Sequence, residues 1–360
     1  MNIKEAGTLT ILRNCLSYLS TLGTLGEYHI IALVYKKELA NFPHIEYIET
    51  QWPKKRWVNR LWYEYVSLKM ISKKIGPVYL WLSLHDTTPN VHAEKQAVYC
   101  HNPFPFYKWK CRELFFTPKI VLFALFSKLI YRKGIHKNNY VIVQQQWLKN
   151  AFKPLFNLSK DKVVVAIPDP PNPLELRPIP IPKKEEAMRF VFAASPNSHK
   201  NFECLCAAAA LLEQEGVDGF KVYITVSGKE NAYAKWLYKK WGDVRAIQWI
   251  GFQTKKTLFE YYSKSDCLVF PSKVETWGLP ISEFATLDKP MLLADLPYAK
   301  ETAAGSKEVC FFNPDRPDQL AEQMKQLIQG KLYILNPAPM LTLEQPVSHS
   351  WKALFDILLA

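Results

Sequence analysis

Two carboxylates flank a small-residue turn in the stretch 269-VFPSKVETWGLPISEFA-285. Glu275 precedes the turn, Glu283 follows it, and Gly278 lies between them. A glycine lets the backbone approach a ligand closely, and the N–H groups at the start of a following helix attract a phosphate. Carboxylate oxygens accept hydrogen bonds from sugar hydroxyls. The stretch therefore predicts a site for a phosphate and a sugar; a loop charge and a helix-dipole residue are the alternative interpretation of the glutamates.

Such a turn requires a buried strand before it and a helix after it. Residues 267–272 form a continuous apolar run, and residues 280–287 have a helical pattern. The same alternation extends through residues 188–329, with predicted strands at 188–195, 221–228, 244–251, 267–272, 291–295 and 309–313, and predicted helices at 201–216, 230–242, 255–265, 280–287, 298–305 and 317–329. Continuous apolar strands that alternate with helices predict a parallel sheet covered on both faces. Ligands bind at the carboxyl ends of the strands in such Rossmann-like sheets.

A lysine follows the first of these strands in 195-SPNSHKNFE-203. Lys200 precedes the next predicted helix, where a cation and free N–H groups together neutralise a diphosphate. The alternative interpretation is a solvated surface lysine. The neighbouring pattern favours phosphate binding.

The amino-terminal half also indicates an α/β domain. Strand-like runs occur at 29–35, 78–84, 96–100 and 140–144, and helical patterns at 8–22, 57–75 and 119–132. Repeated prolines in 167-IPDPPNPLELRPIPIPKKEEA-187 favour an extended connection. We therefore expect an amino-terminal basic domain over 1–165, a hinge over 166–187, a second Rossmann-like domain over 188–330, and a tail with a helix over 331–360 that packs back on the first domain. Two such domains enclose a cleft, a common place for a small-molecule site.

These motifs resemble the retaining nucleotide-sugar glycosyltransferases of family 4, which have the GT-B fold. The resemblance covers most of residues 163–325 through SPNSHKNFECLCAAAALL, VSG and the long segment from Ile247 to Asp295 that contains both glutamates, followed by KET. It implies that Glu275 contacts the donor sugar, that Glu283 binds the ribose hydroxyls, and that Gly278 and Leu279 offer N–H groups to the diphosphate. The looser amino-terminal match implies that His101 meets the donor sugar near the reacting carbon.

The chain departs from the family pattern in two places. The family has an arginine a few residues before the lysine, whereas this chain has Ser195-Pro196-Asn197 there. The family also opens with a β-strand and a glycine-rich loop, whereas the helical pattern here begins by about Thr10, so that first strand is absent or lies upstream. His101 could equally be a turn or packing residue. His85 and Asp86, at a neighbouring strand end, are candidates for the acceptor side.

Charge divides the chain unequally. Residues 1–165 hold 24 Lys and Arg against 10 Asp and Glu, and residues 166–360 hold 22 against 23, so the net charges are +14 and −1. Basic and aromatic residues interleave at 52–65 and 104–137, a composition that suits an anionic membrane surface. The alternative is that these aromatic residues belong to a core and the charges form a solvated rim around it.

The seven cysteines show no CxxC spacing, no signal peptide is visible and no apolar run is long enough to span a bilayer. These features predict a reduced cytoplasmic protein, peripheral at the inner face of the membrane.

Together these observations predict a retaining glycosyltransferase that moves a sugar from a nucleoside diphosphate sugar to a saccharide acceptor, carried on a lipid, in bacterial-type surface polysaccharide synthesis. No Asp-x-Asp motif and no Cys/His cluster occurs, so we expect no metal and no cofactor. A nucleotide-sugar epimerase, a phosphorylase and a catalytically silent relative are the alternatives within the same architecture. A nucleic-acid-binding protein is the alternative from another class, although no recognition motif supports it.

Overall fold

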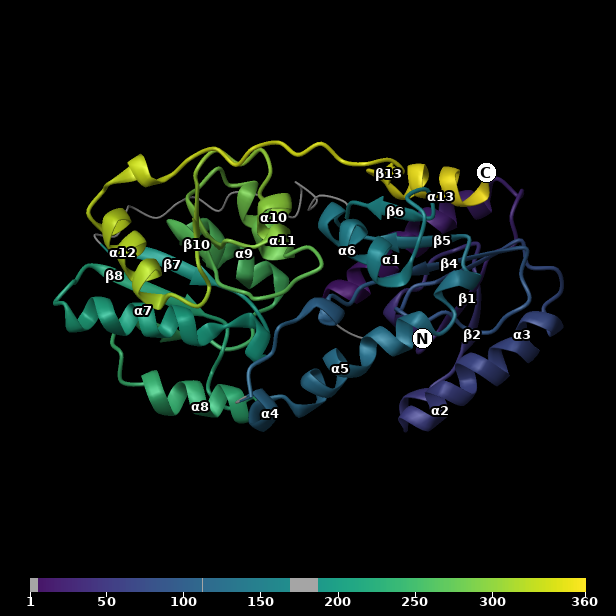
Figure 1. The fold of residues 1–360 in the computed structure, drawn as a ribbon, viewed down its shortest axis with the longest axis horizontal. Helices are drawn as coiled ribbons and strands as arrows, with labels where there is room; N and C mark the ends of the chain where they lie inside the picture. Colours follow the sequence, from purple (N-terminus) through teal and green to yellow (C-terminus); the bar gives the residue numbers. More distant parts are fainter. Residues whose placement is uncertain (1–5, 112, 169–186) are drawn as a thin grey trace. The chain divides into compact units, whose positions relative to one another are not determined.

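The structure is a computed structural model that describes residues 6–111, 113–168 and 187–360 (Figure 1). It divides into two compact units. Unit 1 comprises residues 1–102, 126–169 and 343–360, and unit 2 comprises residues 103–125 and 170–342. Most of the expected proline-rich hinge lies outside the described residues.

Unit 2 contains a six-stranded parallel sheet in the order β12-β11-β10-β7-β8-β9. Its strands are β7 (Met188–Phe192), β8 (Phe220–Ile224), β9 (Ile247–Trp249), β10 (Cys267–Phe270), β11 (Met291–Ala294) and β12 (Val309–Phe312). Every residue of β10 and β11 is buried, as expected for central parallel strands with helices on both faces. The predicted alternation is confirmed strand by strand.

The helices of unit 2 connect these strands and cover the sheet. They are α7 (Phe202–Gln214), α8 (Ala232–Trp241), α9 (Lys255–Lys264), α10 (Leu279–Ala285), α11 (Pro297–Thr302) and α12 (Pro317–Ile328). Helices α7 and α12 lie side by side against the sheet (Figure 1). Asn231 and Thr254 cap α8 and α9 by accepting hydrogen bonds from the backbone N–H groups of Ala234 and Thr257.

Unit 1 contains two separate parallel sheets. The larger has the order β13-β6-β5-β4-β3, and the smaller pairs β1 with β2. Their strands are β1 (Ile31–Val34), β2 (Glu46–Glu49), β3 (Leu80–Ser83), β4 (Lys95–Tyr99), β5 (Tyr140–Val143), β6 (Val163–Ala166) and β13 (Val347–Ser348). The sequence patterns predicted β1, β3, β4 and β5, but they did not predict β2, β6 or β13.

The helices of unit 1 are α1 (Ala6–Thr24), α2 (Trp57–Trp62), α3 (Leu68–Lys74), α6 (Gln146–Phe156) and α13 (Trp351–Leu359). A single helix was expected over 57–75, but a π-helical turn, η3 (Tyr63–Ser67), separates α2 from α3. Helix α13 packs on α1 through the stacked rings of Phe355 and Tyr18, 5.5 Å apart. The buried Lys149 donates hydrogen bonds to the carbonyl oxygens of Glu344 and Gln345, which holds the carboxyl-terminal tail on this unit.

Residues 103–125 were expected in the amino-terminal domain, but their contacts group them with unit 2. They include α4 (Glu113–Phe116) and the start of α5 (Pro118–Arg132). Thr117 Oγ1 and Ser198 Oγ are 2.7 Å apart, and the ring of Phe116 contacts those of Tyr233 and Trp236. These contacts join residues distant in sequence, so no local pattern could show them. No helix in the described ranges is long and apolar enough to cross a membrane.

Candidate functional site

The site in unit 2 begins with two neighbouring strands. Strands β7 and β10 pair in parallel, so the loops that follow them, residues 193–201 and 271–278, leave the same edge of the sheet. This is the carboxyl edge, where ligands bind in open α/β sheets. Both predicted motifs, the one around Lys200 and the one between Glu275 and Glu283, therefore start from adjacent strands.

Asn201 connects the two loops. Its backbone is left-handed, with a φ of 60°, a conformation that asparagine tolerates better than most residues. Its side-chain nitrogen donates to the carbonyl oxygens of Pro271, at 3.0 Å, and Pro314, at 2.8 Å. The backbone N–H of Lys273 donates to the carbonyl of His199 at 2.8 Å. These bonds hold the Lys200 loop against the Glu275 loop.

Lys200 and Glu275 form an ion pair across these loops. Lys200 Nζ lies 2.6 Å from Glu275 Oε1, and the two side chains are only 18% and 13% exposed. A charge-assisted hydrogen bond of this length in a water-poor environment is stronger than one on an open surface. The structure therefore brings together two candidate residues that are far apart in the sequence.

The turn after Glu275 requires its glycine. Gly278 has a φ of 90°, and a Cβ atom built there would lie 3.3 Å from Ile281 Cδ1. Helix α10 then begins at Leu279, with Pro280 in its first turn, where a missing N–H costs no helical bond. The carbonyl of Trp277 accepts a hydrogen bond from Thr302, and Trp277 Nε1 donates to Ser282 Oγ at 3.2 Å. Both flanks of the turn are thus anchored.

Glu283 lies within α10 and is partly exposed. Its charge adds to the effect of burial in raising the pKa of Tyr262 on helix α9, so the carboxylate lies within electrostatic reach of that ring. The structure thus places Lys200, Glu275 and Gly278 on the two joined loops, with Leu279 at the start of α10 and Glu283 one helical turn further along the chain.

His101 follows strand β4 in unit 1. Its ring stacks on Tyr99 with centroids 4.6 Å apart, and its Nε2 lies 3.1 Å from the carbonyl oxygen of Leu84. Because a carbonyl only accepts, Nε2 carries the proton and Nδ1 is the acceptor nitrogen. Burial lowers the pKa of His101, outweighing the nearby charge of Asp86. His101 is therefore neutral at pH 7, with one polar ring edge bound to the protein.

Asp86 and His85 are both engaged in unit 1. Asp86, at a φ of 66°, accepts hydrogen bonds through Oδ1 from the backbone N–H of His101 at 2.6 Å and from Tyr131 Oη at 2.7 Å. His85 Nε2 lies 3.3 Å from Glu64 Oε1, and its Nδ1 lies 3.3 Å from Ser83 Oγ. These contacts make Asp86 a support for the loop that carries His101 and hold the ring of His85 at both nitrogens.

Sequence reasoning missed Glu64, which is buried in the π-helical turn. Burial alone would raise the pKa of Glu64, but hydrogen bonds from His85 and Arg60 and their charges hold it below its usual range. A π-helical turn inside a helix often marks a site under a special constraint. The nearest signal in the sequence was the basic and aromatic composition of residues 52–65, which does not single out one glutamate.

Sequence reasoning also missed Lys273, a second cation on the Glu275 loop. Its side chain is 10% exposed, and its Nζ lies 3.7 Å from Asp315 Oδ1. The family's arginine is replaced at Ser195-Pro196-Asn197, so Lys273 is the next basic residue of these two loops. Arg189 lies near the start of β7, away from the carboxyl edge, and pairs with Asp266 at 3.2 Å. Among the residues that the structure describes, no cluster of three His, Cys, Asp or Glu side chains suits a metal ion.

The fold matches solved glycosyltransferases of the GT-B class. The outer core galactosyltransferase WaaB of lipopolysaccharide, in its apo form, superposes with a TM-score of 0.61 at 12% identity, covering 91% of this chain and 88% of that one. A sucrose-phosphate synthase from Thermosynechococcus elongatus gives 0.61 at 13% identity, covering 88% and 85%. At these identities the likeness shows the fold: two Rossmann-like units of the GT-B architecture.

The family model described as glycosyl transferases group 1 matches residues 176–336. The O-antigen chain mannosyltransferase RfbU of Salmonella typhimurium is 22% identical over 275 residues, which cover 75% of this chain and 71% of that protein. The serotype-specific mannosyltransferase WbdA of Escherichia coli is 30% identical over 95 residues, which cover 26% of this chain and 11% of WbdA.

Proposed function

We propose that this glycosyltransferase transfers a sugar, with net retention, from a nucleoside diphosphate sugar to a saccharide acceptor in the synthesis of a bacterial surface polysaccharide. The observation that carries the proposal is the largely buried Lys200–Glu275 pair beside the Gly278 turn, on the carboxyl edge of β7 and β10. Two proteins similar to this chain, RfbU and WbdA, are named as mannosyltransferases, so mannose is the first sugar to test.

In the proposed donor site, the diphosphate replaces Glu275 as the partner of Lys200. The backbone N–H groups of Gly278 and Leu279 bind the same diphosphate, and Glu283 accepts hydrogen bonds from the ribose hydroxyls. Glu275, released from the lysine, accepts hydrogen bonds from the transferred sugar. A cation already fixed in a water-poor site stabilises the leaving charge with little reorganisation. No metal is needed for this arrangement.

The transfer breaks the bond between the anomeric carbon and the diphosphate oxygen and forms a bond to the acceptor oxygen. The proton of the acceptor hydroxyl passes to the leaving diphosphate. Glu275 is already committed to a cation and then to sugar hydroxyls, so we propose no covalent intermediate on it. In unit 1 we propose that His101 contacts the donor sugar and that the strand ends near His85 and Asp86 receive the acceptor.

A mass-spectrometric screen of the purified protein against UDP-, GDP- and dTDP-linked sugars tests this function. We expect one family of donors to bind or to be hydrolysed slowly, equally well with and without EDTA. If the donor were instead converted into a second free nucleotide sugar in the absence of an acceptor, the protein would be identified as an epimerase. If the protein bound RNA or DNA in a filter-binding assay and responded to no nucleotide sugar, the proposal would be overturned.

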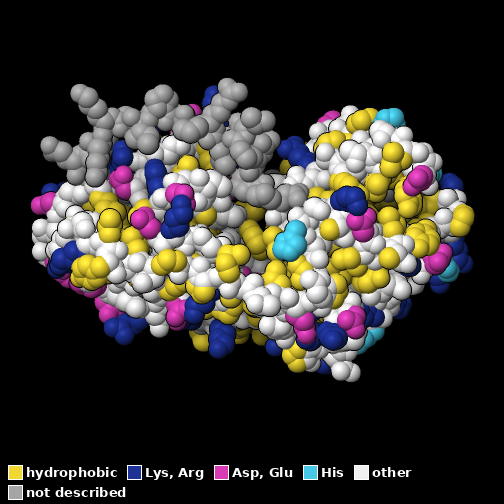
Figure 2. All heavy atoms as spheres, turned by 90° about the horizontal axis from the view of Figure 1, so that it is seen from above, with side chains coloured by type: hydrophobic (Ala, Val, Ile, Leu, Met, Phe, Trp, Pro, Cys, Tyr) yellow, Lys and Arg dark blue, Asp and Glu magenta, His cyan; other side chains and the backbone are white. Residues whose placement is uncertain are grey.

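We further propose that the enzyme works at an anionic membrane surface on a lipid-linked acceptor. Helix α5 supports this because Leu122, Leu125, Phe126 and Leu129, at helical spacing, are each at least half exposed. The same stretch carries the exposed Lys128, Arg132 and Lys133. Apolar side chains beside cations suit the boundary between lipid headgroups and acyl chains. On the face drawn in Figure 2, by contrast, basic side chains lie scattered among acidic ones.

Flotation with vesicles tests this membrane proposal. Each basic residue near an anionic leaflet contributes about 1 kcal/mol, and each buried leucine about 1.5–3 kcal/mol. We expect the double variant Leu125→Gln/Leu129→Gln to bind anionic vesicles at least tenfold more weakly than the unmodified chain. Tyr333→Gln, which changes an aromatic side chain that is 73% exposed on unit 2, is the matched control. Equal flotation of the two variants, or no binding at low salt, would refute it.

A further inference from the structure

The loop that carries Lys200 contacts a segment from earlier in the chain. This segment, which we call the brace, comprises residues 103–111 and 113–117, and its contacts place it in unit 2. Thr117 of the brace and Ser198 of the loop are joined through their hydroxyl groups, whose oxygens lie 2.7 Å apart. Both side chains are buried, and a hydrogen bond shielded from water is stronger than one on the surface.

The brace also holds His199, the residue between Ser198 and Lys200. The rings of Phe104 and Tyr107 meet the ring of His199 nearly at right angles, with centroids 5.1 and 6.1 Å away. Burial, and then the charge of Lys200, keep the pKa of His199 well below its usual value, so the ring is neutral and packs as an aromatic group. The two residues before Lys200 are thus both anchored to the brace.

The local backbone links these two anchors to Lys200. The three residues form a single 3₁₀ turn, η7 (Ser198–Lys200). A 3₁₀ helix has three residues per turn, so the three side chains leave it in directions about 120° apart. Ser198 and His199 take the directions of the brace, and Lys200 takes the direction of Glu275. Because the turn is so short, holding the first two side chains also orients the third.

A buried hydrogen bond stiffens the brace itself. Tyr107 Oη donates to Glu113 Oε2 at 2.5 Å, and both side chains are buried. Burial, and then this bond, raise the pKa of Tyr107, so its hydroxyl keeps the proton that it donates. The other oxygen of Glu113, Oε1, has no hydrogen-bond partner among the described residues. A buried polar atom without a partner costs free energy, so the covering of apolar residues does not by itself account for this glutamate.

Two further contacts fix the brace to unit 2 independently of the Lys200 loop. The ring of Phe116 on α4 contacts the rings of Tyr233 and Trp236 on α8, and the two helices lie next to each other in Figure 1. Lys110 Nζ lies 2.7 Å from Asp315 Oδ1, in an exposed pair that adds little to stability. The brace therefore has a footing of its own from which it can hold the loop.

We propose that the brace is a positioning element of the donor site, and that Thr117 and Tyr107 act on the reaction by holding Lys200 in place. The proposal rests on the proposed function in one respect, namely that Lys200 meets the donor diphosphate. When that diphosphate replaces Glu275, the ion pair no longer orients the lysine, so the position of its loop depends on the brace and on Asn201. A cation held in place before the reaction stabilises a leaving charge without reorganisation.

Replacing Thr117 with valine in the whole chain tests the proposal. Valine keeps the shape of the side chain but removes the hydroxyl that meets Ser198. We expect UDP, GDP or dTDP, whichever the unmodified chain binds, to bind about tenfold more weakly, the loss that corresponds to one buried hydrogen bond. Hydrogen exchange of the backbone N–H groups of Lys200 and Asn201, which donate within the turn, should become about tenfold faster. Thr117→Ser, which keeps the hydroxyl, should restore both quantities.

Combining this variant with Lys200→Ala separates positioning from general stability. If Thr117 acts through Lys200, the double variant Thr117→Val/Lys200→Ala should bind nucleoside diphosphate no more weakly than Lys200→Ala alone. Additive losses from the two replacements would show that Thr117 only stabilises the fold, and the proposal would be wrong.

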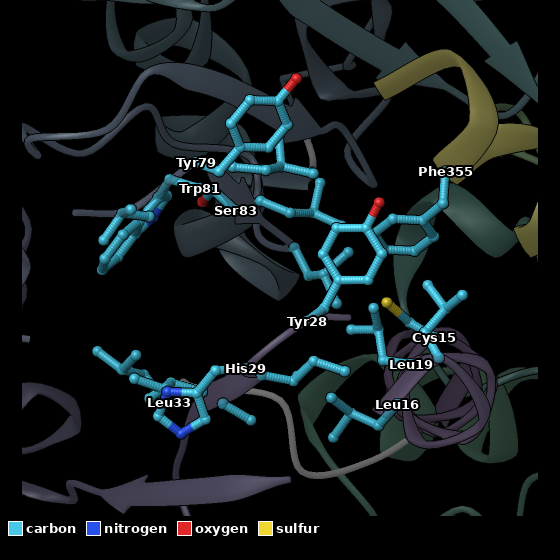
Figure 3. Close-up of a pocket in the computed structure, with 18 of the residues that line it drawn as sticks. Cys15, Leu16, Leu19, Tyr28, His29, Leu33, Tyr79, Trp81, Ser83 and Phe355 are labelled. Atoms are coloured by element: carbon cyan, nitrogen blue, oxygen red, sulfur yellow. The ribbon is translucent and has the colours of Figure 1, made fainter. Parts of the chain in front are cut away.

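Two tyrosines provide a second, matched comparison. Tyr107→Phe removes the hydroxyl that donates to Glu113. Tyr79→Phe removes a hydroxyl in unit 1, where Tyr79 Oη donates to the carbonyl oxygen of Leu359 at 2.9 Å and the ring lines a cavity of about 460 Å³ (Figure 3). We expect faster exchange at Lys200 in the first variant and unchanged exchange there in the second. Equal exchange at Lys200 in the two variants would count against the brace.

Hydrogen exchange also distinguishes failure of this proposal from failure of the proposed function, because it needs no ligand. If the unmodified chain bound none of the three nucleoside diphosphates, but Thr117→Val still exchanged faster at Lys200, the brace would stand and the proposed function would fall. If a nucleoside diphosphate bound and exchange at Lys200 were the same in Thr117→Val as in the unmodified chain, the brace would fall and the proposed function would stand.

Discussion

Replacing Lys200 with alanine is expected to lower the rate of sugar transfer by about 10²–10³-fold, the usual loss when one group that stabilises a developing charge is removed. Lys200 Nζ is held 2.6 Å from Glu275, on the loop next to the Gly278 turn. In the proposed donor site, loss of the lysine would leave the diphosphate with the backbone N–H groups of Gly278 and Leu279 as its partners. Steady-state transfer and calorimetric binding of the free nucleoside diphosphate measure the two consequences, and both are expected to fall.

The variant Lys325→Ala is the control for Lys200→Ala. Lys325 also pairs with a glutamate, Glu215, at 2.7 Å, but on α12, outside the two site loops. Because Lys200→Ala leaves Glu275 without its cation, a loss of about 1–3 kcal/mol in folding free energy is expected as well. The double variant Lys200→Ala/Glu275→Ala removes that stranded charge, so it should regain thermal stability without regaining activity. Recovery of activity in the double variant would show that the pair is only structural.

The fold of unit 2 was predictable because its strands are continuous apolar runs separated by strong helix and turn signals. The run CLVF of β10 and the Trp-Gly-Leu-Pro turn after it carry both kinds of information locally. The pairing of Lys200 with Glu275 was not predictable from spacing. It depends on the adjacency of β7 and β10 and on the side chain of Asn201, which are set by the tertiary structure.

Unit 1 was harder to predict because its elements depend on distant partners. Strand β2, with the sequence EYIE, has only two adjacent apolar residues between its two glutamates and lies at an edge, where burial is weak. Strand β13 has two residues and exists only because β6 lies beside it. Helical periodicity over 57–75 correctly predicted helix, but it does not encode the π-helical turn in which Glu64 is buried against His85.

Replacing Glu275 with glutamine is expected to separate chemistry from nucleotide binding. Glutamine keeps the size of the side chain but removes the charge that Lys200 contacts and that the sugar hydroxyls would meet. We expect transfer to fall on the order of 10²-fold, because a neutral amide is a weaker acceptor for those hydroxyls. The free nucleoside diphosphate should bind several-fold more tightly, because Lys200 no longer has a competing anion at 2.6 Å.

The two variants are expected to change nucleoside diphosphate binding in opposite directions. Lys200→Ala should weaken nucleoside diphosphate binding, whereas Glu275→Gln should strengthen it, and both should slow transfer. Glu215→Gln, at the exposed partner of Lys325, should change neither quantity. If Glu275 served only to neutralise Lys200, its replacement would leave transfer unchanged or faster. Unaltered transfer by Glu275→Gln together with tighter nucleotide binding would therefore remove Glu275 from the sugar site while keeping Lys200 in the diphosphate site.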